Sequence, residues 1–466
     1  MSQPPVVRPD SSWRFELTKY PLVRRVLKWR PLQFTLVLIT LGFFVLALLT
    51  AFFGTPAGNR NFSIIFVWIV WWGLVIILLV PALGRGWCAI CPIPAPGEWL
   101  QRQSLVHPRR RTLWTLGKRW PRRLKNIWIQ NFAFLAVALF SAIILTTPVA
   151  TGVVLLAFIL LAVGLSLVYE RRTFCRYVCP VGGFIGLYSM TAPIELRVKD
   201  VEVCRTHDTK ECYLGSEQGF GCPWLVFPGS LTRNTYCGLC TECLKSCSMN
   251  NVAINLRPPG ADLFVAKGRR MDEAYKAFIM LTCALAYSAI LLGPWGLLKD
   301  AANMARLEWW LIYAAGFLAL NLVIVPGVFF ATAWLSRRWA ALHQIKTKAL
   351  FMDFAYTLVP LGLAAWIAFS LGFVLVNISY ALPVIADPFG WGWNLFGLRD
   401  VPWTPLFPAL VPYLQAPVLL AGLAFSIHTT WRIAQEATRT RTLQAALPVT
   451  GFLTLATLGF LALRKA

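Results

Sequence analysis

The sequence predicts an all-α polytopic membrane protein, with about nine transmembrane helices and a cysteine-rich segment inserted among them. Of the 466 residues, 57% are hydrophobic and only 14% are charged, which is far from the composition of a soluble globular domain. Tryptophan occurs 21 times, as expected when indole rings lie at two membrane–water interfaces. Seven of the 12 cysteines fall between residues 204 and 247. These observations indicate a membrane protein built around a thiol-rich segment.

The apolar runs mark the predicted helices. A helix needs about 17 to 25 apolar residues to cross the hydrocarbon core, and its backbone groups must bond within the helix because lipid offers no partner. Only "TTPVAT" separates the third run from the fourth, so these two helices are expected to form a tight hairpin. The predicted spans are 33–54, 62–82, 129–148, 150–169, 275–296, 309–334, 354–377, 408–428 and 444–463.

The basic residues orient these helices through the positive-inside rule. The first 31 residues hold seven Lys and Arg side chains and segment 85–125 holds ten, whereas loops 55–61 and 378–408 hold one each. This alternation predicts a multi-pass protein of the cytoplasmic (inner) membrane, with its N-terminus and its cysteine-rich segment in the cytoplasm. The net charge of +24 is divided among short loops between apolar runs, so a membrane-lipid environment is expected and a nucleic-acid partner is not.

The same pattern divides the chain into four regions. Cytosolic cysteines stay reduced, so the dense cysteine pattern of the third region is expected to hold metal and not disulfides. The regions are a basic cytoplasmic N-terminus (1–31), a four-helix membrane part (32–194), the cysteine-rich segment (195–262) and a five-helix membrane part (263–466).

The stretch "NTYCGLCTECLKSCSMNN" carries the strongest chemical signal. Its cysteines follow the spacing C-x2-C-x2-C-x3-C. In bacterial ferredoxins three such cysteines bind three corners of one [4Fe–4S] cube, and the fourth reaches the neighbouring cube. The alternative is structural zinc, which prefers tetrahedral sites built from separated cysteine pairs. The four cysteines are Cys237, Cys240, Cys243 and Cys247.

Three cysteines upstream complete a predicted ferredoxin-like 2[4Fe–4S] segment. Cys222 is followed by a proline, as is typical of the crossing ligand, and is expected to complete the cube of Cys237, Cys240 and Cys243. Cys247 is then expected to join Cys204 and Cys212 in a second cube. The segment offers no fourth cysteine for that cube, and the open candidates are His207, Asp208, a cysteine from elsewhere, water, or no ligand at all, which would give a three-iron cluster.

Two further motifs end predicted helices at the cytoplasmic face. "GRGWCAICP" contains Cys88 and Cys91, and "RRTFCRYVCP" contains Cys175 and Cys179. Together they offer four ligands for a third cluster. Alternatively they form a redox-active dithiol or a transient metal site, since closely spaced cysteines beside basic residues have lowered pKa values. The remaining interpretation is a set of buried thiols at proline-terminated helix ends.

Other polar residues point to no second cofactor. No C-x-x-C-H motif occurs, and only His428 lies near a predicted span, so haem is not expected. Cys283 stands alone inside the fifth span and is expected to pack there. Loop 378–408, with Trp391 and Trp403, fits an aromatic belt, an outer docking surface or part of a quinone pocket. No row of intramembrane acidic residues suggests a transport path.

The motifs "GWCAICP", "CRYVCPVGG" and "RNTYCGLCTECLKSC" resemble those of NapH/NosR-type, polyferredoxin-like membrane proteins, over about residues 62–256. The resemblance implies electron transfer between the quinone pool and a respiratory partner on the outer side of the membrane. The five spans after residue 270 fall outside it.

We therefore expect a membrane-bound iron–sulfur electron-transfer protein. It would relay electrons between the quinone pool or a cytosolic donor and a respiratory redox partner, as the quinol-oxidising or electron-transfer subunit of an oxidoreductase complex. Expected partners are a redox subunit or cytochrome, and an acidic ferredoxin or flavodoxin attracted by the basic loops. The alternatives are a maturation factor that reduces a metal or thiol of another respiratory enzyme, and a transporter with a regulatory cluster.

Overall fold

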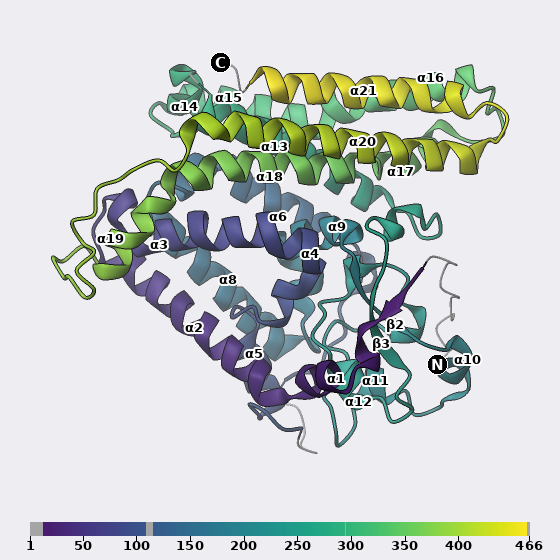
Figure 1. Ribbon diagram of the computed structural model, residues 1–466, viewed down its shortest axis with the longest axis horizontal. Helices are drawn as coiled ribbons and strands as arrows, with labels where there is room; N and C mark the ends of the chain where they lie inside the picture. The colour runs from purple at the N-terminus through teal and green to yellow at the C-terminus, as the bar shows by residue number, and fades with distance from the viewer. Residues whose placement is uncertain (1–12, 109–114, 294, 464–466) are drawn as a thin grey trace. The chain divides into compact units, whose positions relative to one another are not determined.

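The computed structural model describes residues 13–108, 115–293 and 295–463 (Figure 1). The chain divides into two compact units, each assembled from three separate stretches. The first, which we call the cysteine unit, comprises Met1–Val45, Leu79–Gln130 and Leu155–Val265. The second, which we call the helical unit, comprises Leu46–Leu78, Asn131–Val154 and Ala266–Ala466.

Eight of the described helices are long and apolar enough to cross a membrane. Their hydrogen bonds are made within each helix, which is what the lipid interior requires. The protein is therefore a multi-pass membrane protein. The eight are Arg30–Phe53 (α2), Phe62–Ala89 (including α3, Phe62–Ile64, and α4, Val80–Leu83), Pro148–Val168 (α8), Met271–Leu292 (α13), Leu307–Trp339 (α15, Leu307–Ala319, and α16, Val325–Trp339), Thr347–Ala386 (α17 to α19), Pro408–Ala437 (including α20, Val411–Ala437) and Thr442–Ala462 (α21).

The predicted span 129–148 is divided in the structure. It forms α6 (Trp128–Leu139) and α7 (Ser141–Ile144), which are separated at Phe140, where φ is −92° and ψ is 10°. A 12-residue helix is about 18 Å long, short of the roughly 30 Å hydrocarbon core. The expected count of nine spans is therefore not reproduced by the described helices, and the side of the membrane that each loop faces stays a prediction.

The core of the helical unit lies around α18 (Leu358–Asn377). Figure 1 shows α18 beside α13 and α20, and all three pack together. The indole of Trp366 is fully buried and donates to the carbonyl oxygen of Met280 in α13 at 2.9 Å. A Cβ on Gly422 of α20 would overlap that of Ala364 of α18, so glycine permits this close approach. Further helices of the unit are α14 (Gly296–Ala302), α17 (Thr347–Ala355) and α19 (Ala381–Ala386).

The cysteine unit contains a three-stranded antiparallel sheet in the order β1-β3-β2. Strand β2 (Ile194–Val198) pairs along its whole length with β3 (Val252–Leu256), and β1 (Phe15–Glu16) pairs with the end of β3. Three short helices lie between β2 and β3 in the chain, and each carries one of the predicted ligand cysteines. They are α10 (Val201–Thr206), α11 (Glu211–Leu214) and α12 (Glu242–Ser246); α1 (Pro21–Lys28), α5 (Ala95–Arg102) and α9 (Pro180–Tyr188) complete the unit.

A buried ionic network joins this sheet to the cysteine loops. Arg197 in β2 bonds Asp262 at 3.0 Å, and Arg257 after β3 bonds Glu195 at 3.0 Å as well as Asp262. Asp262 also accepts from the backbone N–H of Asn234 at 2.6 Å, three residues before Cys237. Because each of these ionised side chains is at most 5% exposed, the network links the position of the loop to the sheet.

Candidate functional site

The first helix-end motif lies where the second apolar helix breaks off. Helix α4 stops at Gly84, whose φ of +59° is favourable for glycine, and a Cβ there would lie 2.9 Å from the Cβ of Ser189. A tight turn, Gly84–Ala89, then presents Cys88, and Cys91 follows before α5. The chain therefore leaves the membrane helix in a turn that buries Cys88.

The second helix-end motif consists of a π-helical turn followed by the N-terminus of α9. Cys175 lies in a π-helical turn, Phe174–Val178, a rare geometry that recurs at functional sites. Cys179 caps the N-terminus of α9, and its Sγ accepts from the backbone N–H of Gly182 at 3.2 Å. A helix N-terminus stabilises negative charge, so this sulfur is placed to bind as a thiolate.

The structure brings these four thiols together, and we call them the helix-end group. Burial raises the pKa of Cys175, and the neighbouring thiols Cys179, Cys91 and Cys88 raise it further. Burial likewise raises the pKa of Cys91, to which Cys88 and Cys179 add. The four thiols therefore lie close enough to interact electrostatically, with Cys88, Cys175 and Cys179 buried and Cys91 partly buried.

A second set, which we call the middle group, consists of Cys222, Cys237, Cys240 and Cys243. Burial raises the pKa of Cys243 well above its usual value, and the other three thiols of the group add to the effect. The loop bends through two non-glycine residues with positive φ on either side of Cys240, namely Leu239 at +49° and Thr241 at +59°. Such strain is tolerated where the surroundings fix the backbone, and it is common at functional sites.

The third set, which we call the three-thiol group, consists of Cys204, Cys212 and Cys247. Burial raises the pKa of Cys212 to about 12, with Cys247 and Cys204 as the next causes. Asn251 donates hydrogen bonds to two of these sulfurs, a role that was not predicted from the sequence. Its side-chain amide donates to Cys204 Sγ at 3.2 Å and its backbone N–H to Cys247 Sγ at 3.4 Å. Hydrogen bonds to sulfur tune the reduction potential of a cluster.

The surroundings of His207 and Asp208, two of the candidates for the open corner of the three-thiol group, leave the fourth ligand undecided. The ring of His207 bonds the hydroxyl of Thr209 at 3.0 Å, and Asp208 is exposed. The additional cysteine that acts on Cys212 is Cys222, which already belongs to the middle group. The fourth ligand therefore stays open.

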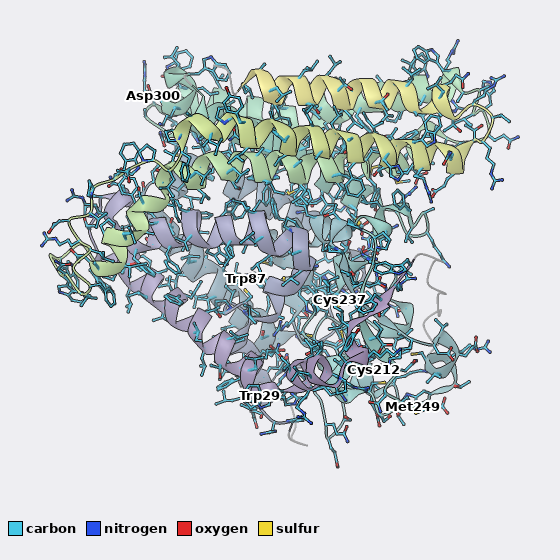
Figure 2. All side chains as sticks on the ribbon, in the orientation of Figure 1. Trp29, Trp87, Cys212, Cys237, Met249 and Asp300 are labelled. Carbon is cyan, nitrogen blue, oxygen red and sulfur yellow. The ribbon has the colours of Figure 1, made fainter. Side chains whose placement is uncertain are left out.

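Two buried clusters of side chains connect the three groups in series. One packs Cys88, Cys175 and Cys179 together with Cys240 of the middle group. The other packs Cys243 of the middle group together with Cys204 and Cys212. Figure 2 shows Cys237 and Cys212 close to β3, whose side chains belong to the second cluster. The order is therefore helix-end group, middle group, three-thiol group.

Buried cations accompany the thiols and fit an anionic cofactor. Arg172 donates through Nε and Nη2 to Glu98 Oε2 at 3.0 and 2.7 Å and through Nη1 to the carbonyl of Cys88 at 2.9 Å. Arg85 is 5% exposed, and its Nε and Nη2 have no hydrogen-bond partner among the described residues. A buried guanidinium with free N–H groups needs an anion, which a thiolate-bound cluster supplies.

In the described part of the chain, no group of three or more His, Cys, Asp or Glu side chains forms a single-ion site. A cube makes a different demand, since each thiolate binds its own iron at a separate corner. The cysteines that would hold such clusters are the three groups just defined.

Thiol reactivity distinguishes a cluster site from a redox-active dithiol. The dithiol interpretation of the helix-end cysteines expected lowered pKa values, but burial raises the pKa of Cys179 to about 11. Burial also raises the pKa of Cys237, in the middle group, to about 11. A thiol with that pKa is ionised to roughly one part in a thousand at pH 8. In folded, metal-free protein, iodoacetamide is therefore expected to alkylate both residues about a hundredfold more slowly than after unfolding in guanidinium, as mass spectrometry of the peptides would measure. Rapid labelling of folded Cys179 at pH 8 would favour the dithiol.

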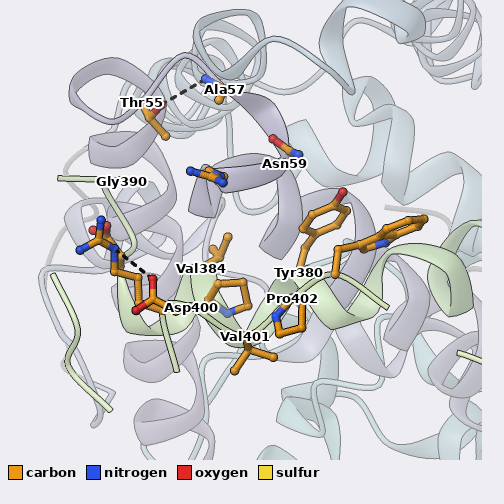
Figure 3. Close-up of a pocket in the computed structure, with 14 residues that line it drawn as sticks. Thr55, Ala57, Asn59, Tyr380, Val384, Gly390, Asp400, Val401 and Pro402 are labelled. Atoms are coloured by element: carbon orange, nitrogen blue, oxygen red, sulfur yellow. Dashed lines mark hydrogen bonds and ion pairs between the residues drawn. The ribbon is translucent and has the colours of Figure 1, made fainter. Parts of the chain in front are cut away.

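Loop 378–408, which was predicted to face outward, lines a polar cavity of about 660 Å³ within the helical unit (Figure 3). Tyr380, Trp403 and Arg60 line it, together with Asp387 and Arg399. Asp387 closes the loop by accepting from the backbone N–H groups that follow it. The lining is charged, which suits a docking surface better than the apolar pocket that a quinone requires.

A buried ionic network at the start of α13 was not predicted from the sequence. Tyr356 donates to Glu273 Oε2, Arg270 bonds Asp272 at 2.6 Å, and Lys276 is fully buried. The carboxylates were overlooked because the predicted span began at 275, whereas α13 begins at Met271 and places them in its first turn. There they stabilise the helix N-terminus and do not form a row along the helix.

Cys283 lies apart from the three groups, inside α13. It is fully buried, and its Sγ donates to Asn321 Oδ1 at 3.4 Å. That position agrees with its expected packing role.

Comparison with known proteins identifies part of this site. A family model described as a 4Fe-4S binding domain matches residues 64–122 and 151–192, the two stretches that carry the helix-end group. No curated protein and no solved structure matches the chain. The chain therefore contains a 4Fe–4S binding domain, and with its eight described apolar helices it is a multi-pass membrane iron–sulfur protein.

Proposed function

We propose that the protein is an electron-transfer subunit of NapH/NosR type, which relays electrons between the quinone pool or a cytosolic donor and a respiratory redox partner. The observation that carries this proposal is the series of 11 cysteines in three adjoining groups. The middle and helix-end groups would each hold a [4Fe–4S] cluster, and the three-thiol group would hold a third. Adjoining clusters form a path along which single electrons pass.

A membrane donor has a suitable binding place in the cysteine unit. An apolar bay of about 820 Å³ is lined by Trp99, Leu105 and Val106. The same three residues line a second chamber, of about 60 Å³, whose wall includes Cys240 of the middle group. A hydroquinone in the bay would therefore lie next to this group, and His107 at the bay offers an imidazole for a released proton. The volume is within the usual range for a ligand site.

A cytosolic donor would approach the other end of the series. Lys28 of α1 lies near Cys247, and Lys210 donates to the carbonyl of Cys204 at 2.5 Å. Cations around the three-thiol group would attract an acidic ferredoxin or flavodoxin, which supports the proposed cytoplasmic orientation of this group.

Reduction by quinol tests the proposal. We would record EPR spectra of anaerobically purified protein before and after adding a quinol analogue, with dithionite for full reduction. Reduced-cluster signals with quinol are expected for the wild type and for Leu214→Arg, a control at an exposed position away from the bay. Leu105→Arg, which places a charge in the bay, should keep the dithionite signals and lose the quinol signals.

Each other outcome has a defined meaning. Signals with dithionite alone in the wild type would favour a cytosolic donor or the maturation role. Protein that contains iron but gives no signal with either reagent would contradict the cluster assignment. A respiratory subunit should also co-purify with its partner in a one-to-one ratio, whereas a maturation factor should not.

A further inference from the structure

Arg85 is a buried cation that pairs with no carboxylate among the described residues. It lies in the turn before Cys88 and is 5% exposed. Its Nη1 donates to the backbone carbonyl of Thr235, and its Nε and Nη2 bond nothing among the described residues. Arg172 differs in this respect, because Glu98 neutralises it through two hydrogen bonds. Arg85 therefore contributes an uncompensated positive charge to the interior of the cysteine unit.

The protein backbone is shaped around this guanidinium. On one side, α9 presents two glycines, and a Cβ would lie 3.3 Å from Nη2 at Gly182 and 2.8 Å from Nη1 at Gly186. On the other side, the ring of Trp224 lies 4.1 Å from the guanidinium carbon. The side chain is held between a helix backbone and an indole ring, a cation–π geometry that stabilises it in part.

This position faces two thiol groups at once. Gly182 donates its N–H to Cys179 Sγ in the helix-end group, and Thr235, which accepts from Arg85, lies two residues before Cys237 in the middle group. The guanidinium of Arg85 therefore lies against the backbone segments that carry Cys179 and Cys237. One cation thus lies beside two thiol groups, and unlike Arg172 it has no described carboxylate to neutralise it.

Burying an unpaired guanidinium costs several kcal/mol, so the functional state must supply an anion beside it. Each electron added to a thiolate-bound cluster makes that cluster more negative. A fixed cation therefore stabilises the reduced form more than the oxidised form and raises the reduction potential. Because Arg85 faces both groups, it acts on both potentials together.

We propose that Arg85 is the shared counter-cation of two iron–sulfur clusters, one on the helix-end group and one on the middle group. It would raise both potentials and keep them close enough for an electron to pass between the two. The step is the movement of one electron, which oxidises one cluster and reduces the other, with no bond formed and no proton transferred. Arg85 is a positioning residue, and this inference rests on the proposed function.

The test is a redox titration of the purified protein followed by EPR. Arg85→Met removes the charge and keeps a long side chain. The midpoint reduction potentials of the clusters on the helix-end and middle groups are expected to fall by at least 59 mV, which corresponds to a tenfold change in a one-electron equilibrium constant. The midpoint potential of the three-thiol group should stay unchanged. Arg85→Lys should retain most of the wild-type values. Arg306→Gln, a loss of charge at a site of the helical unit that is 70% exposed, should leave all midpoints within experimental error.

Unchanged midpoints in iron-replete Arg85→Met would overturn the inference. If Arg85→Met loses iron, Arg85→Lys becomes the deciding variant. Retained iron and unchanged reduction potentials in Arg85→Lys would support a role of the charge, whereas loss of iron in this variant as well would overturn the inference. Gly186→Ala, which pushes against Nη1, should lower the same two midpoints by a smaller amount. Absence of any cluster in the wild type would instead refute the proposed function, so the two failures are distinguishable.

Discussion

Cys240→Ala should lower the iron content by about four atoms per chain, because the middle group would lose one corner of its cube. Cys240 is 8% exposed, and it packs with the helix-end thiols through the first of the two buried clusters. Its loss should therefore also interrupt the series, so that quinol no longer reduces the three-thiol group. Iron analysis and EPR of the anaerobically purified variant would measure both effects.

Cys283→Ala is the matched control, since it removes another buried thiol that belongs to none of the three groups. It should leave the iron content and all EPR signals unchanged. Full iron content in Cys240→Ala would show that the middle group is not the ligand set. Equal iron loss in both variants would point to misfolding and not to loss of a ligand.

Asp262→Ala is expected to destabilise the cysteine unit by about 3 to 5 kcal/mol, because it leaves two buried arginines, Arg197 and Arg257, to share the one carboxylate of Glu195. Asp262 bonds Arg197 and Arg257, and it fixes the N–H of Asn234 just before the cysteine loop. Iron binding by the middle group should weaken together with folding. The urea midpoint of the tryptophan fluorescence, compared with wild type at pH 7, gives the measurement.

The contribution of Asp262 to the stability of the fold depends on pH in a definite direction. Burial alone would raise the pKa of Asp262, but the ion pairs with Arg197 and Arg257 lower it below its usual value. The stabilisation by Asp262 is therefore present above the unfolded pKa of about 3.9 and is lost as the pH falls through the lower folded value. The loss of stability caused by Asp262→Ala should accordingly shrink at such low pH.

Glu202→Gln, which breaks an exposed ion pair with Arg205, is the control and should cost at most about 1 kcal/mol. A similar loss in both variants would contradict the special role of the buried network.

The cysteine pattern was the most informative part of the sequence. Ligand spacing in ferredoxins reflects the geometry of the cube, so the grouping of Cys222 with Cys237, Cys240 and Cys243 could be predicted from spacing and one proline. The structure places these thiols together, and it also gathers the two helix-end motifs into one group. Which atoms each group binds stays a prediction.

Other features depend on contacts between distant parts of the chain, and local patterns cannot show them. Asn251 and Arg85 look like ordinary polar residues until folding places them beside sulfur atoms. The break at Phe140 interrupts a continuous apolar run that hydropathy reads as one span. Glu273 was hidden because a hydropathy window excludes charged residues at a helix end, although the fold buries them there.

The pairing of β1 with β3 has a consequence for biosynthesis. Thr18 beside β1 accepts from the backbone N–H of Ile254, 236 residues further along the chain. At roughly 5 to 20 residues per second, the ribosome delivers that partner only tens of seconds after the N-terminal segment has emerged. Several apolar helices are translated during this interval and must enter the bilayer. The sheet can form only afterwards. Pairing of the N-terminal strand with β3 would therefore be a late step of folding, which completes the cysteine unit once the helices between the two strands have entered the membrane.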